Sequence, residues 1–98
     1  MEVQYGDNHL KSLAIDKTYK PKGISAELLS SYRKRITQMQ AAPDERTLRA
    51  LKSLHFEKLK GREDEYSIRL NDQWRLVFSF DESTVPKKIK ISGIEDYH

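Results

Sequence analysis

The chain has 98 residues, 37% hydrophobic and 34% charged, and its 18 Lys and Arg against 15 Asp and Glu give a net charge of +3. This length fits one domain over residues 1–98, and the absence of cysteine excludes disulfides, thiolate metal sites and cysteine nucleophiles. No apolar stretch approaches the roughly 20 residues of a membrane span and no signal-peptide core is present, so we expect a cytoplasmic protein without a membrane partner.

The first half of the chain carries helix signals. The run VQY at 3–5 is a candidate edge strand, and DNHLKSLAI at 7–15 predicts a short helix with an acid or amide cap. The segment PDERTLRALKSL at 43–54 predicts a further helix whose inward-facing residues are Leu48, Leu51 and Leu54.

The strongest helix prediction starts at Ser25 and ends near Ala42. Ser25 can cap the first turn, where Glu27 meets the positive end of the helix dipole. Apolar residues then recur at helical spacing, which is more typical of a core-facing stripe than of a cofactor site: Leu28, Leu29, Tyr32, Ile36 and Met39.

The second half changes to the period of strands. Apolar and polar residues alternate over 66–71, 74–80 and 88–92, with turn residues between the first two runs. Gly93 breaks the alternation, because Ile94 takes the parity of the preceding lysines, and this predicts a bulge that re-aims the following residues. Helices followed by hairpin-connected strands predict an α+β fold, with N-terminal helices packed on one face of a small antiparallel sheet of about three to five strands.

The other face of this sheet is predicted to be polar and basic, with Ser67, Arg69, Arg75 and Val77. Strand spacing puts Arg69 and Arg75 on the same side of adjacent strands, where two guanidiniums repel unless an anion or nearby acids compensate them. A phosphodiester suits them, because each guanidinium offers forked donors to phosphate oxygens. Pairing with surface Asp and Glu is the alternative, and strand parity does not decide between the two.

The groups that could transfer protons include three histidines and the closing triplet Asp96-Tyr97-His98. The predicted bulge at Gly93 can turn this triplet toward the basic face. His9 is expected to be a surface residue, and His55 taken alone is more typical of a structural one. RNA cleavage without a metal needs a base for the 2′-OH, an acid for the 5′-oxygen and cations for the developing charge, and all these residue types are present. No metal-ligand spacing, glycine-rich phosphate loop or nucleophile elbow stands out, so we expect neither a metal nor a cofactor.

The segment LKGREDEYSIRLNDQWRLVFSF at 59–80 and the closing EDYH resemble the HigB toxins, of the RelE-like superfamily of bacterial type II toxin–antitoxin systems. The resemblance is looser over AAPDERTLRAL and slight in the first 24 residues. It implies a compact RelE-like fold and a toxin that enters the A site of the 70S ribosome and cuts mRNA there, without a metal, through the substrate's own 2′-OH. It also implies a HigA-like helix-turn-helix antitoxin, through which alone the toxin would meet operator DNA.

Position by position, the resemblance implies a catalytic group made of His55, Lys60, Arg75, Asp96, Tyr97 and His98. One histidine and Asp96 would share the proton transfers, and Tyr97 would orient the substrate or stack on it. Arg75 and Lys60 would stabilise the charge of the transition state. Which histidine is the acid, and whether Asp96 is the base, stays open. A second set is expected to meet RNA, mainly ribosomal RNA phosphate, with Arg69 the weakest match: Lys58, Arg69, Lys87, Lys88 and Lys90.

Two departures from the family pattern bear on these roles. LHFEKLKG at 54–61 separates His55 from the LKG motif by more residues than in some relatives, which puts its reach to the phosphate in question. REDEY at 62–66 sets three acids beside the basic face, where they would weaken RNA binding or compensate the charge when RNA is absent. The competing hypothesis is a non-catalytic module that binds RNA or protein and acts mainly as an antitoxin-bound co-repressor.

Overall fold

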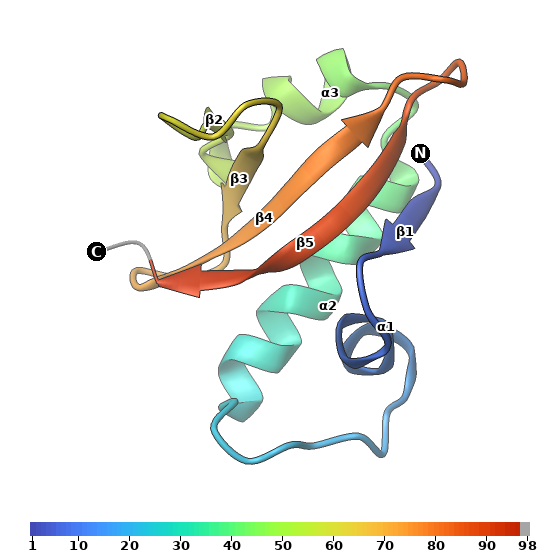
Figure 1. Cartoon of the computed structure of the whole chain (residues 1–98). Coiled ribbons are helices and arrows are strands. Elements are labelled where there is room, and N and C mark those ends of the chain that lie inside the picture. Colours follow the sequence, from blue (N-terminus) through green and yellow to red (C-terminus); the bar gives the residue numbers. More distant parts are fainter. Residues whose placement is uncertain (97–98) are drawn as a thin grey trace.

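A computed structural model describes residues 1–96 of the chain. It contains one five-stranded sheet of order β1-β5-β4-β3-β2, with the helices packed against it (Figure 1). No helix within residues 1–96 has the length and apolar character needed to cross a membrane. The predicted α+β fold is confirmed by the elements β1 (Val3–Tyr5), α1 (Asn8–Ile15), α2 (Ala26–Ala41), α3 (Glu45–Ala50), the 3-10 turn η1 (Lys52–Leu54), β2 (Glu57–Lys58), β3 (Tyr66–Arg69), β4 (Trp74–Asp81) and β5 (Lys88–Asp96).

The sheet is mixed rather than purely antiparallel. β1 pairs with β5 in parallel, and all other pairs are antiparallel. A long connection separates β1 from the other strands, as a parallel pair requires, whereas short turns join β3, β4 and β5. Gly6, the residue after β1, lies close to the backbone of β5. Its N–H donates to the Ile91 carbonyl at 2.8 Å, and a Cβ on Gly6 would lie 2.9 Å from that oxygen.

The apolar stripe predicted on the long helix forms the helical side of the core. All five predicted residues of α2 are buried, and the Ser25 side chain accepts a hydrogen bond from the Leu28 N–H at 3.0 Å, as the cap prediction requires. The Tyr32 hydroxyl donates to the carbonyl of Leu10 at 2.8 Å, which joins α2 to α1. The sheet contributes to the same cluster Ile68, Leu76, Phe78, Ile89 and Ile91.

The helix predicted over 43–54 is shorter than expected. α3 ends at Ala50, and the turn η1 carries the chain onward. Leu48 and Leu54 are fully buried, but Leu51 is 39% exposed, so the prediction that it faces inward is wrong. Leu51 is the C-cap of α3 with φ −78° and ψ 96°, and this extended backbone takes it out of the helical register that buries Leu48.

The break of phase predicted at Gly93 is confirmed as a bulge in β5. Val77 pairs with Gly93 and Phe78 with Ile91, so Ser92 is the extra residue. A one-residue bulge reverses the side of every later residue in the strand. The bulge therefore decides which of the last residues share a face with Arg75.

Candidate functional site

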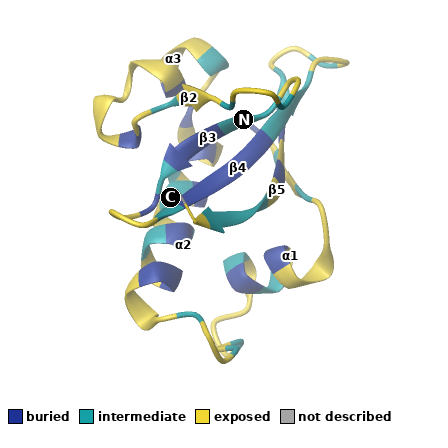
Figure 2. Ribbon diagram, turned by 60° about the vertical axis from the view of Figure 1, so that its left-hand side comes forward, coloured by how far each residue is buried: buried dark blue, intermediate teal, exposed yellow. Residues whose placement is uncertain are grey.

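We call the sheet surface that carries Ser67, Arg75 and Val77 the outer face; the helices cover the other side. The register places Arg69 of β3, Arg75 of β4 and Glu95 of β5 in one row across it. The prediction that the two arginines lie on the same side of adjacent strands is thus confirmed. This face was predicted to be polar and basic, but its centre is not open to solvent, because Ser67, Arg75 and Val77 are only 0%, 6% and 2% exposed. Figure 2 shows much of β4 coloured as buried.

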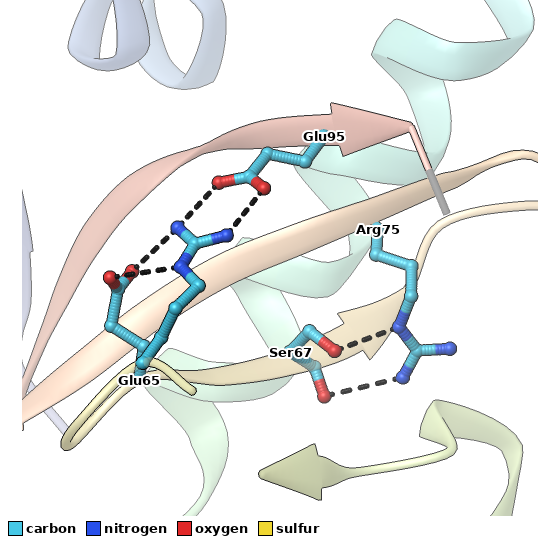
Figure 3. Close-up of polar contacts among 5 residues, drawn as sticks. Glu65, Ser67, Arg75 and Glu95 are labelled. Carbon is cyan, nitrogen blue, oxygen red and sulfur yellow. Dashed lines mark hydrogen bonds and ion pairs between the residues drawn. The ribbon is translucent and has the colours of Figure 1, made fainter. Parts of the chain in front are cut away.

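Arg75 is a buried guanidinium held by two segments of the chain. Its Nε donates to Ser67 Oγ at 2.8 Å and its Nη2 to the Ser67 carbonyl at 3.4 Å (Figure 3). Nη2 also donates to the carbonyl of His55. Because a planar group with several hydrogen bonds has little rotational freedom, Arg75 is a fixed positive charge rather than a mobile surface side chain.

His55 reaches the outer face through its backbone. It follows η1 in the left-handed conformation, with φ 48° and ψ 54°, which costs a non-glycine residue on the order of 1 kcal/mol. In this conformation its carbonyl accepts the hydrogen bond from Arg75, and His55 itself is exposed. The extra residues before the LKG motif therefore do not take His55 away from Arg75.

Arg62, which the sequence did not single out, bridges the outer face. Its Nη1 and Nη2 donate to the Glu95 carboxylate at 2.6 and 2.8 Å, and its Nη2 and Nε donate to the Glu65 carboxylate at 3.1 and 3.2 Å (Figure 3). Arg62 lies between β2 and β3 and Glu95 on β5, so the bridge crosses β4. The hydrogen bonds from Arg62 hold the pKa of the Glu95 carboxyl below its usual range, and the two carboxylates raise the pKa of Arg62.

Acids compensate the guanidiniums at the edges of the outer face. Arg69 forms an ion pair with Asp72, so acid pairing is the alternative that the structure shows for this arginine. Within the REDEY segment, Glu65 takes the compensating role through its pair with Arg62. An RNA phosphate that approaches Arg62 or Arg69 would compete with carboxylates already in place. The sequence did contain one signal for the role of Arg62. The bulge reverses strand parity and puts the Glu95 carboxylate on the outer face, where a cation would stabilise it.

Asp96, the last residue described, lies outside the row of Arg75. It pairs with Trp74 across β4 and β5, and its Oδ2 accepts a hydrogen bond from Gln73 Nε2 at 3.1 Å. The bulge was expected to turn Asp96 toward the basic face, but it brings Glu95 there instead, because adjacent strand residues alternate sides. Tyr97 and His98, the other members of the predicted terminal group, lie outside the described residues.

Two of the lysines predicted to bind RNA are engaged with acids. Lys87 lies 2.8 Å from Glu45 and 3.2 Å from Glu82, and the hydrogen bonds to these carboxylates raise its pKa. Lys88 lies 3.6 Å from Glu2. These contacts reduce the free positive charge along the start of β5.

The other predicted lysines are exposed and have no ion pair within residues 1–96: Lys58, Lys60 and Lys90. Lys58 and Lys60 line an open hollow of about 530 Å³ along the β2–β3 connection. Lys58 pairs with Tyr66 and so lies on the other side of the sheet from Arg75. Of these two, Lys60 is the accessible ammonium group within the β2–β3 connection itself.

This arrangement supplies a fixed cation in Arg75, an exposed histidine whose carbonyl contacts it, and exposed lysines in β2, in the β2–β3 connection and in β5. These groups suit binding of a polyanion and transfer of protons near it. No group of three or more His, Asp or Glu side chains within residues 1–96 is arranged to hold a metal ion.

A comparison with protein families identifies the chain. The family model described as "RelE-like toxin of type II toxin-antitoxin system HigB" matches residues 3–91. The matched range includes His55, Lys60 and Arg75 and stops before the last strand ends. A search of curated proteins found no match. The chain belongs to the HigB-like family of RelE-like toxins of type II toxin–antitoxin systems.

Proposed function

We propose that this toxin is a ribosome-dependent endoribonuclease that cleaves mRNA at the A-site codon and thereby inhibits translation and growth. Membership of the HigB-like family supports the toxin role and implies an antitoxin partner. The observation that carries the nuclease proposal is the fixed Arg75 guanidinium with the backbone of His55 against it, at the end of the sheet where β5 finishes.

The proposed reaction needs no group beyond the chain and the substrate. A base takes the proton of the 2′-OH, the 2′-oxygen attacks the adjacent phosphorus, and the bond from phosphorus to the 5′-oxygen breaks. An acid protonates that oxygen, which leaves a 2′,3′-cyclic phosphate and a free 5′-OH. Following the resemblance, we assign the proton transfers to Asp96 and to one of His55 and His98, and substrate orientation to Tyr97. Asp96 ends β5 and faces away from the Arg75 row, so this assignment places the scissile phosphate at the end of the sheet rather than over its centre.

The cations have different tasks in this proposal. Arg75 is 6% exposed, so it serves as a fixed charge at the floor of the site that needs no rearrangement when charge develops on the phosphate. Lys60 is exposed and can approach the phosphate oxygens directly. Lys58 and Lys90 would add sequence-blind contacts to RNA phosphates.

The partners follow from the same proposal. We expect a helix-turn-helix antitoxin, operator DNA contacted only through it, and the 70S ribosome with its mRNA in the cytoplasm. We also propose that residues 1–98 act as one domain, because β1 and β5 come from opposite ends of the chain and lie side by side in the sheet.

Purified protein added to mRNA-programmed ribosomes, with cuts mapped by primer extension, tests the nuclease. The wild type should cut at the A-site codon, and His98→Ala should lower the rate by about 10²- to 10⁴-fold, the usual contribution of a general acid or base. Lys60→Ala should slow cleavage, whereas Lys52→Ala removes another exposed ammonium group, from η1, and should not.

Intact mRNA at stoichiometric wild-type protein would refute the nuclease and favour the antitoxin-bound co-repressor. Full activity of His98→Ala would refute the role of that residue alone.

A further inference from the structure

The excess of positive over negative charge lies in the first two helices and the loop between them. Residues 8–41, from the start of α1 to the end of α2, contain seven Lys and Arg and two acids, a net charge of +5. Because the whole chain carries +3, all other residues together carry −2. The part of the chain that holds the candidate active site therefore does not attract a polyanion by its net charge.

The polar contacts follow the same division. Every ion pair within residues 1–96 joins side chains outside 8–41. Inside that segment, Arg33 donates to the carbonyls of Leu13 and Asp16 at 2.9 and 3.1 Å, and Arg35 donates to that of Arg69 at 3.0 Å. These two arginines brace the fold. Within residues 8–41, five lysines are exposed and have no acid partner among the described residues: Lys11, Lys17, Lys20, Lys22 and Lys34.

Three of these cations, Lys17, Lys20 and Lys22, lie in the α1–α2 loop, and we call residues 17–22 the lysine loop. Asp16, just before it, is occupied locally: its Oδ1 accepts from the hydroxyl and N–H of Thr18 at 2.6 and 2.9 Å, and these bonds lower its pKa. Lys20 helps to line a hollow of about 430 Å³ against the first turns of α2. The loop lies at the end of the molecule away from α3 and β2 (Figures 1 and 2).

We propose that the lysine loop docks on the phosphates of ribosomal RNA, an inference that rests on the proposed ribosome-dependent function. Exposed ammonium groups on flexible stems bind phosphates through charge and without reading sequence. No lysine of the loop forms an ion pair among the described residues, so this surface accepts a polyanion without displacing carboxylates, in contrast to Arg62 and Arg69 on the outer face.

The position of the loop selects ribosomal RNA over the substrate mRNA. The loop lies on the helical side of the sheet and the Arg75 row on the outer face, and the longest extent of the molecule is 35 Å. A codon bound at the outer face does not extend around the sheet to the helices. A large folded RNA that surrounds the protein presents phosphates to both sides.

The test measures binding of the full chain to purified 70S ribosomes without mRNA over a series of salt concentrations. Lys20→Gln with Lys22→Gln should reduce the slope of log affinity against log salt by about 1.4 to 1.8, since each lost phosphate contact removes about 0.7 to 0.9. Arg46→Gln with Lys52→Gln makes the same change of net charge at exposed positions of α3 and η1, and should leave the slope unaltered. Both variants should melt at the wild-type temperature.

The outcomes separate this inference from the proposed function. A lysine-loop variant with the wild-type slope, or one matched by the control variant, overturns the docking surface even if the wild type cuts mRNA. Salt-dependent binding that falls in the lysine-loop variant supports the surface even if the wild type does not cut. Weaker binding to the antitoxin, with ribosome binding intact, overturns the RNA assignment in favour of a protein partner.

Discussion

Replacing Arg75 by alanine should lower the free energy of unfolding as well as impair any catalysis. The substitution removes the donor for Ser67 Oγ and for the His55 carbonyl, and leaves both acceptors without it at a position only 6% exposed. A buried acceptor without its donor costs about 1 to 3 kcal/mol. Two such losses give about 3 kcal/mol as a working value, or about 12 to 24 °C in melting temperature for a domain of this size.

Urea denaturation and thermal melting of Arg75→Ala, Ser67→Ala and the double variant measure this effect. Ser67→Ala removes one acceptor of the same contact, so the two single losses should not add. Their coupling should amount to about 1 kcal/mol or more, because the residues touch. An Arg75→Ala protein with an unfolding free energy within about 0.5 kcal/mol of the wild type would refute the buried, fixed guanidinium. Arg75→Lys keeps the charge but lacks the planar fork, so it should recover only part of the loss.

Gly6→Ala should lower the free energy of unfolding by about 1 to 3 kcal/mol in chemical denaturation, because the new Cβ would lie 2.9 Å from a backbone oxygen of β5. Gly93→Ala is the control: a Cβ there would have nothing within 4 Å, so the free energy of unfolding should change by about 0.5 kcal/mol or less. Tyr32→Phe removes a fully buried hydroxyl that donates at 2.8 Å and should cost about 1 to 2 kcal/mol, with an unchanged melting temperature as the contrary result. The depressed pKa of Glu95 should stabilise the fold above the ordinary value of 4.5, and this contribution should vanish as pH falls through the folded value. The difference in unfolding free energy between the wild type and Glu95→Gln, taken from urea curves, should therefore shrink as pH falls below 4.5, and a constant difference would contradict the assignment.

Local periodicity was enough to predict most of the fold. The apolar stripe of α2 and the alternation in β3, β4 and β5 reflect which side of each element is buried, and burial repeats with the period of the element. The parallel pairing of β1 with β5 has no such local signal, because it joins Val3 to Ile89. The prediction that Leu51 is buried was wrong for a related reason: the helical period continues in the sequence beyond the residue at which the helix ends.

The site could be predicted only where strand parity governs it. Parity placed Arg69 beside Arg75, and the break at Gly93 predicted the bulge. Parity did not show that Arg75 is buried, because its contacts come from Ser67 and from a backbone carbonyl that η1 positions. The ion pairs on the outer face depend on partners that are distant in the sequence, which strand parity does not identify. Arg62 and Glu95, for example, are 33 residues apart.

The bulge and the Arg62 bridge together explain how two distant segments come to share one site. Without the extra residue at Ser92, Glu95 would face the helices and could not meet a guanidinium on the outer face. With it, Arg62 connects the end of β5 to the β2–β3 connection that carries Lys60. A bidentate guanidinium–carboxylate pair restricts both distance and orientation. The segment bearing the proposed phosphate-binding lysine and the strand leading to the proposed acid–base group are therefore held in register with each other, while Arg75 beneath them is held independently by β3 and η1.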